Sequence, residues 1–138
     1  MQQQTSLSKR IMIIEDDPAL SEVLANLFND LGFECSIETD APEISVIEVF
    51  MPDLIVIDYH LPKVNGGEIC GAIKQNPNLC QVPVIVISAY SKIILHLDGS
   101  SFDCFIEKPF SLDEIVGPVR RLLAKKENRK KVLGKFSS

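Results

Sequence analysis

Acidic side chains directly follow two short apolar segments of the chain. Glu15 and Asp16 come after "RIMII" (10–14). Asp58 comes after "LIVI" (54–57). Continuous apolar runs are typical of buried strands in parallel sheets. The carboxyl ends of such strands lie at one edge of the sheet, and open α/β sheets bind ligands at that edge. Two carboxylates about 4 Å apart repel by about 4 kcal/mol at an effective dielectric constant near 20. We therefore expect Mg²⁺, a hard cation that prefers oxygen ligands, to be held by Asp16 and Asp58.

A hydroxyl and an amine follow the next two apolar segments. Ser88 ends "VPVIVIS" (82–88), and Lys108 comes soon after "CFI" (104–106). A carboxylate can act as the nucleophile in phosphoryl transfer, and Mg²⁺ neutralises the charge of the incoming group. If Asp58 is that nucleophile, Lys108 would pair with one phosphoryl oxygen and the Ser88 hydroxyl would hydrogen-bond another. The pattern therefore indicates phosphoryl chemistry.

Each of these residues, taken alone, also has a purely structural interpretation. Asp17, beside the acidic pair, is typical of a helix cap. Asp58 could serve a turn before Pro62, Ser88 could be an ordinary hydroxyl at a strand end, and Lys108 could be a loop lysine. Their convergence at one edge of a sheet favours the functional interpretation over four separate structural ones.

The elements that would position these residues alternate between apolar and amphipathic segments, which is typical of βαβ units and an α/β fold. The predicted strands are 10–14, 33–38, 54–57, 82–88 and 104–106. The first predicted helix starts near Pro18. Three more are predicted over 40–50, 66–76 and 111–126, and a short or irregular helix is predicted within 89–103.

Capping signals mark three of the predicted helices. Asp17 precedes Pro18, a residue favoured in the first turn of a helix. Asp40 is the predicted cap of the second helix. Ser111 and Glu114 have the spacing of a capping box before the last helix.

The composition is that of an ordinary globular domain. The chain has 138 residues, and 46% of them are hydrophobic. No apolar run is long enough to span a bilayer, and the start lacks the apolar segment of a signal peptide, so we expect a cytoplasmic protein. The four cysteines form no C-x-x-C pair, which argues against a zinc site and favours packing as small apolar side chains.

The charge is unevenly distributed. The net charge is −5, yet residues 120–138 are basic and the rest of the chain is acidic. A basic tail could touch nucleic acid or an acidic membrane, but a solvated helix end is the favoured interpretation. We expect no direct DNA binding by this chain and no membrane span.

Four motifs, in this order, resemble the receiver domain of two-component response regulators, the CheY-like family. They are "IIEDD" (13–17), "DLIVIDYHLPKVNG" (53–66), "VIVISAY" (84–90) and "EKPF" (107–110). The resemblance covers residues 8–126 and implies a doubly wound, flavodoxin-like (βα)5 fold whose five-stranded parallel sheet has the order 2-1-3-4-5. Residues 1–7 and 127–138 are expected to be disordered tails.

The resemblance implies a metal site and a phosphoacceptor. Asp58 would accept a phosphoryl group, with Mg²⁺, from a phosphohistidine on a sensor histidine kinase or a histidine phosphotransfer protein. Asp16 and Asp58 would bind the metal directly, Glu15 would act through water, and the backbone carbonyl of His60 would complete the protein ligands. Gly66 matches the glycine that closes the loop after the third strand.

The resemblance also implies a switch that changes a surface for a downstream effector protein. Ser88 and Lys108 match the family's hydroxyl and lysine positions, and Pro109 stands where a cis peptide bond is expected. Phe105 occupies the aromatic switch position of the fifth strand, and its ring could turn into the space that movement of Ser88 would free. The chain would catalyse its own phosphorylation and slow dephosphorylation without being a metabolic enzyme.

The sequence departs from the family pattern in three ways. Phe105 lacks the hydroxyl of a tyrosine, and the Ser88–Lys108 spacing is about two residues shorter than usual, which affects the docking surface around the fourth helix. His60 and Tyr90 are bulky side chains at positions that flank the phosphorylation pocket. Our hypothesis is that they slow hydrolysis of the phosphoryl group.

Two other functions compete with a phospho-accepting receiver. One is a degenerate receiver that acts only as a protein-binding module. The other is a Mg²⁺-dependent phosphatase or phosphotransferase of the haloacid-dehalogenase type, which would carry a second aspartate where this chain has His60. The cognate kinase, the output partner and the oligomeric state stay open, as does whether the chain is a fragment of a larger protein.

Overall fold

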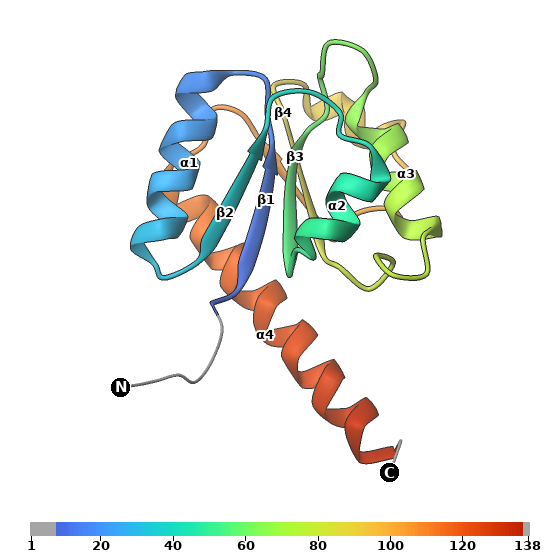
Figure 1. The fold of residues 1–138 in the computed structure, drawn as a ribbon. Coiled ribbons are helices and arrows are strands. Elements are labelled where there is room, and N and C mark those ends of the chain that lie inside the picture. Colours follow the sequence, from blue (N-terminus) through green and yellow to red (C-terminus); the bar gives the residue numbers. More distant parts are fainter. Residues whose placement is uncertain (1–7, 137–138) are drawn as a thin grey trace.

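The computed structural model describes residues 8–136 and contains a five-stranded parallel sheet (Figure 1). The strand order β2-β1-β3-β4-β5 confirms the predicted order. Each strand lies within about two residues of its predicted bounds. The strands are β1 (Arg10–Ile14), β2 (Glu34–Glu38), β3 (Leu54–Asp58), β4 (Val84–Ser88) and β5 (Cys104–Glu107).

Helices cover both faces of the sheet (Figure 1). They are α1 (Pro18–Asp30), α2 (Ile44–Phe50), α3 (Gly66–Gln75), the 3₁₀ helix η1 (Ser91–Leu95) and α4 (Leu112–Phe136). Alternate residues of β1 point to opposite faces, as the two-residue period of a strand requires. Ile11 and Ile13 belong to the core beneath α1 and α4. Met12 and Ile14 belong to the core beneath α2 and α3.

The capping residue predicted for α1 is correct, and the one predicted for α2 is wrong. Asp17 caps α1 and accepts a hydrogen bond of 3.0 Å from a backbone N–H two residues later. The cap of α2 is Glu43 and not Asp40, whose carboxylate instead accepts from the N–H of Ala41. Pro42 explains the difference, because the residue before a proline is disfavoured in helical conformation.

The segment between β4 and β5 contains the short helix that the sequence predicted. It forms only η1, a single 3₁₀ helix. Asp98 then accepts hydrogen bonds from the N–H and the hydroxyl of Ser100, while Ser101 donates to the Asp98 carbonyl. These local bonds compete with helical ones, so the helix that ended at Leu95 does not resume before β5.

Helix α4 is longer than predicted. Its first turn contains the expected bond from the Ser111 N–H to the Glu114 carboxylate, at 2.8 Å. The helix then continues to Phe136, so residues 127–136 are helical and do not form the expected disordered tail. The charged residues of this segment are good helix formers, which explains the extension. The expected disorder of residues 1–7 and 137–138 lies outside the described residues.

Two ion pairs tie α4 to the body of the domain where it passes the lower end of the sheet (Figure 1). Lys9 Nζ lies 2.6 Å from a carboxylate oxygen of Glu127. Lys126 Nζ lies 3.3 Å from a carboxylate oxygen of Asp53, the residue that precedes β3. The second pair is largely buried, and it joins α4 to the start of β3.

Candidate functional site

Three carboxylates meet at the carboxyl edge of the sheet, as the sequence predicted. Strands β1 and β3 are hydrogen-bonded neighbours, so the residues that follow them lie side by side. One carboxylate oxygen from each of Glu15, Asp16 and Asp58 lies within 4.8 Å of the chosen oxygens of the other two. Glu15 is fully buried, Asp58 is 4% exposed, and Asp16 is exposed. The cluster therefore opens to solvent beside Asp16 and is closed behind Glu15.

Lys108 bridges the two buried carboxylates. Its Nζ donates a hydrogen bond of 2.9 Å to Glu15 and one of 3.1 Å to Asp58. The peptide bond between Lys108 and Pro109 is cis, as expected. The sequence placed Lys108 at this edge but did not predict that it bridges two acids. Its ammonium group offsets part of their repulsion, because an opposite charge at hydrogen-bond distance favours both ionised forms.

Backbone N–H groups engage the remaining oxygens of the same two carboxylates. Asp58 Oδ1 accepts from the N–H of His60 at 3.0 Å. Glu15 Oε2 accepts from the N–H of Asp17 at 3.2 Å. Each buried acid therefore has one backbone donor and shares Lys108, which fixes the orientation of both side chains.

The burial of this cluster shifts its proton equilibria. Desolvation raises the pKa of Glu15 from 4.5 to about 7, helped by the nearby charge of Asp58 and opposed by the hydrogen bond from Lys108. Burial acts against the charge of Lys108, but its bonds to the two carboxylates outweigh burial and raise its pKa above 10.5. Lys108 is thus a permanent cation at neutral pH, whereas Glu15 titrates near neutrality.

Gly66 allows α3 to begin directly against the end of β3. A Cβ atom at this position would lie 2.6 Å from the backbone oxygen of Asp58 and 2.8 Å from the Cα of Tyr59. The Gly66 N–H donates to the Tyr59 carbonyl at 2.7 Å. The absence of a side chain at Gly66 therefore permits the close approach that closes the loop carrying Asp58 and His60.

Ser88 ends β4 and is fully buried. Its hydroxyl accepts a hydrogen bond of 3.0 Å from the Tyr90 N–H and donates a longer one of 3.4 Å to the Tyr90 carbonyl. This arrangement is a local serine turn, a conformation that serine hydroxyls favour after a strand. Sequence reasoning identified Ser88 but missed the role of the Tyr90 backbone, although a serine turn is a recognisable local pattern.

The family model for the response regulator receiver domain matches residues 11–120. The chain belongs to this family. The receiver family also accounts for the sheet order and for the acidic edge described above. With the family shown, the haloacid-dehalogenase alternative is set aside.

Relatives of this receiver include longer regulatory proteins. The DNA-binding dual master transcriptional regulator RpaA of Synechocystis is 32% identical over 117 residues, which cover 83% of this chain and 48% of that protein. The DNA-binding response regulator MtrA of Mycolicibacterium smegmatis is 28% identical over 127 residues, covering 89% and 54%. This chain therefore spans about half the length of the curated relatives that it matches. Our expectation that it does not itself bind DNA stays a prediction.

Solved receiver structures superpose well on this one. The receiver domain of a histidine kinase from Syntrophus aciditrophicus has a TM-score of 0.78 and 28% identity, covering 86% of this chain and 92% of that chain. The response regulator TrrA from Thermotoga maritima, in complex with Mg²⁺ and BeF, has a TM-score of 0.75 and 26% identity, covering 83% and 98%. The CheY-like receiver from Methanospirillum hungatei has a TM-score of 0.77 and 25% identity, covering 89% and 99%.

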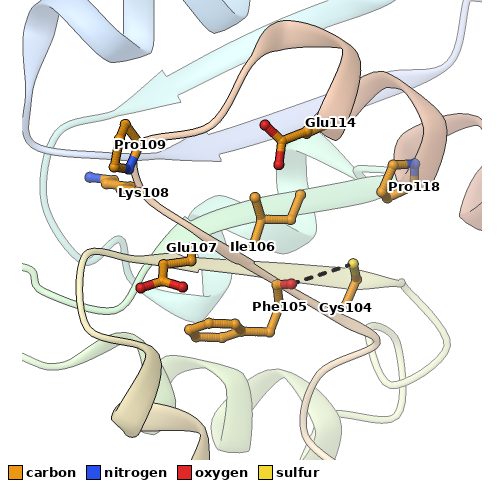
Figure 2. A pocket seen from close by; sticks show the side chains of 8 residues that line it. All are labelled: Cys104, Phe105, Ile106, Glu107, Lys108, Pro109, Glu114 and Pro118. Carbon is orange, nitrogen blue, oxygen red and sulfur yellow. Dashed lines mark hydrogen bonds between the residues drawn. The ribbon is translucent and has the colours of Figure 1, made fainter.

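Phe105, the predicted switch residue of this receiver, lies on β5 and is half-buried against the core beneath α2 and α3. Figure 2 shows its ring and the Glu107 side chain on one side of β5, while Ile106 points to the other side, toward α4. A cavity of about 580 Å³ lies along this strand; its lining includes Lys108 and extends to Pro118 of α4. Phe105 therefore lies between the core and a surface cavity that begins next to the acidic cluster.

The remaining expectations concern the cysteines and the membrane. The four cysteines are free thiols, and burial raises the pKa of the most buried one, Cys70, to about 12. Within residues 8–136, no helix has the length and apolar character required to cross a bilayer.

Proposed function

We propose that this receiver accepts a phosphoryl group on Asp58 from a phosphohistidine of a sensor histidine kinase or a histidine phosphotransfer protein. The observation that carries the proposal is the cluster of Glu15, Asp16 and Asp58, in which one oxygen from each carboxylate lies within 4.8 Å of the other two. Lys108 pairs with both Glu15 and Asp58. Such a cluster suits a cation that prefers oxygen ligands. A cytoplasmic location, where we expect the donor's phosphohistidine, is part of the proposal.

The residues present fit Mg²⁺. Asp16 and Asp58 would bind it directly, Glu15 through water, and the His60 carbonyl would supply a further oxygen. When bound, the ion would neutralise charge on the phosphoryl group and on the attacking carboxylate. Asp16 is exposed, so an ion can enter from solvent at that side.

In the transfer step, a carboxylate oxygen of Asp58 forms a bond to phosphorus while the bond from phosphorus to the donor's imidazole nitrogen breaks. Lys108 already contacts Asp58 Oδ2 at 3.1 Å, so a small movement would place its ammonium group on a phosphoryl oxygen. Ser88 would donate its hydroxyl to another phosphoryl oxygen. These contacts place positive charge and a hydrogen-bond donor where negative charge accumulates.

Phosphorylation would then change the effector surface. It adds about one to two negative charges and strong acceptor oxygens at Asp58. Movement of Ser88 toward the phosphoryl group would leave space behind β4, into which the half-buried Phe105 could turn. The surface from η1 through β5 to α4 would change with it, and a downstream effector protein would bind one of its two forms.

Intact-protein mass spectrometry tests the proposal. The full chain is incubated with Mg²⁺ and acetyl phosphate, and we expect the mass of one phosphoryl group on the wild type and none on Asp58→Asn. Asp17→Asn is the matched control, because it changes a neighbouring acid while asparagine can still cap α1. Failure of the wild type to gain the adduct would favour the alternative of a degenerate receiver that acts only as a binding module.

A further inference from the structure

Three aromatic rings connect the loop that follows Asp58 to the loop that follows β4. The Tyr59 and His60 rings are 5.1 Å apart with an angle of 76° between their planes. The His60 and Tyr90 rings are 5.2 Å apart at 73°. Both are edge-to-face contacts, a geometry that aromatic pairs favour. Tyr59 packs against the core beneath α2 and α3, whereas Tyr90 is 65% exposed. His60 therefore connects an anchored ring to an exposed one.

The residue at the exposed end of this ring series, Tyr90, is hydrogen-bonded to Ser88 through its backbone. The N–H and carbonyl of Tyr90 make both hydrogen bonds of the Ser88 hydroxyl described above. The Tyr90 carbonyl also accepts from the Ile93 N–H at 3.1 Å, at the start of η1. A displacement of Tyr90 would therefore alter the Ser88 hydroxyl and the first turn of η1 together.

We propose that the contact between the His60 and Tyr90 rings is a latch that stabilises the resting arrangement of the loop between β4 and η1. This inference rests on the proposed function, in which the Ser88 hydroxyl must turn toward a phosphoryl group on Asp58. While the latch is closed, the Tyr90 backbone holds that hydroxyl in the serine turn. His60 and Tyr90 are thus positioning residues, which act on the phosphoryl group through Ser88.

The position of His60 makes the latch responsive to Asp58. The His60 N–H donates to Asp58 Oδ1 at 3.0 Å, so a group bonded to that carboxylate would disturb the residue that carries the ring. An edge-to-face aromatic contact typically changes an equilibrium constant roughly two- to tenfold. Because His60 and Tyr90 are both exposed, the lower part of this range applies. Opening the latch should therefore favour the activated arrangement by a few-fold.

Binding of beryllium fluoride with Mg²⁺, a non-covalent mimic of the phosphoryl group, measures this equilibrium. We expect His60→Leu and Tyr90→Leu each to bind beryllium fluoride a few-fold more tightly than the wild type, roughly two- to fourfold. The double variant should match the single ones, since either substitution removes the same contact. His60→Phe keeps a ring at this position and should restore an affinity near that of the wild type.

Two further measurements distinguish a latch from a general change in the pocket. Mg²⁺ affinity without beryllium fluoride should be equal in Tyr90→Leu and the wild type, because Tyr90 supplies no proposed ligand to the ion. In the wild type, NMR should show proximity of the His60 and Tyr90 ring protons in the free protein and lose it when beryllium fluoride binds. Persistence of that proximity, or a parallel change in Mg²⁺ affinity, would overturn the latch.

The remaining outcomes separate the two proposals. If the wild type binds beryllium fluoride but the leucine variants bind it no more tightly, the latch is wrong and the proposed function stands. Additive effects of His60→Leu and Tyr90→Leu would also contradict a shared contact. If the wild type neither binds beryllium fluoride nor gains a phosphoryl group from acetyl phosphate, both the proposed function and the latch are wrong.

Discussion

Substitution of Glu15 by glutamine should change how the stability of the fold depends on pH. In the folded protein the pKa of Glu15 is raised to about 7, from an ordinary value of 4.5 that we take for the unfolded chain. Between these two values the unfolded chain has released the proton while the folded protein retains it. The free energy of unfolding therefore falls as pH rises, by about 1.4 kcal/mol per pH unit, and the loss is complete above pH 7.

The size of the effect follows from the two pKa values. Between pH 5 and pH 8, titration of Glu15 lowers the free energy of unfolding of the wild type by about 2.5 kcal/mol. A glutamine side chain has no proton to release, so the stability of the Glu15→Gln variant relative to the wild type should rise by about that amount over this range. Loss of the bond between residue 15 and Lys108 adds an offset, but the offset does not vary with pH because Lys108 stays charged throughout.

Urea denaturation in EDTA at several pH values between 5 and 8 measures this difference. EDTA removes divalent cations, whose binding to ionised carboxylates would mask the effect. Glu22→Gln, an exposed substitution on α1, is the control and should follow the wild type at every pH. For the other described groups with shifted pKa values, the pKa is raised from 9.0 or above or lowered from 4.5 or below. These groups should therefore contribute little to the pH dependence of stability between pH 5 and pH 8. A Glu15→Gln curve parallel to that of the wild type would refute the raised pKa.

Three further predictions test the metal, the loop after β3 and the pocket mouth. Mg²⁺ affinity measured by titration calorimetry should increase between pH 6 and pH 7.5 in the wild type, because the ion competes with the proton on Glu15, and the Glu15→Gln variant should lack this increase. Gly66→Ala should lower the midpoint of thermal unfolding, because its Cβ would contact backbone atoms of β3, whereas Gly71→Ala, which meets open space within α3, should raise stability by up to about 1 kcal/mol. The double variant His60→Ala, Tyr90→Ala should lose its phosphoryl group faster than the wild type, measured as decay of the mass adduct; an equal or slower rate would contradict shielding by these rings.

The sequence predicted the sheet and its acidic edge because both depend on strong, local patterns. Each strand is a short apolar run, and parallel strands put the residues that follow them on a common edge. The residues at that edge, including Asp58 and Ser88, could therefore be placed from their positions after strands alone. The strand order additionally required the resemblance to the receiver family.

Other features depend on side-chain orientation, which such patterns do not specify. Two adjacent acids follow β1, and the pattern could not show that Glu15 points into the protein while Asp16 remains exposed. The bridge made by Lys108 depends on that choice. The start of α2 was predicted wrongly because a capping residue, Asp40, was given more weight than Pro42. The length of α4 was underestimated because charged residues suit both a solvated helix and a disordered tail.

The three acids at the edge are not equivalent, and their environments support the choice of Asp58 as the acceptor in the proposed function. Glu15 is fully buried, and with a pKa of about 7 it is protonated in a large fraction of molecules at neutral pH, which makes it a poor nucleophile. Asp16 is exposed, so it is well placed to receive an ion from solvent. Asp58 alone combines a narrow opening to solvent with a direct contact to Lys108 and a backbone donor from His60. Under the proposed function, the hydrogen bond from Lys108 to Glu15 would help to keep the ammonium group beside Asp58, where it could meet a phosphoryl oxygen.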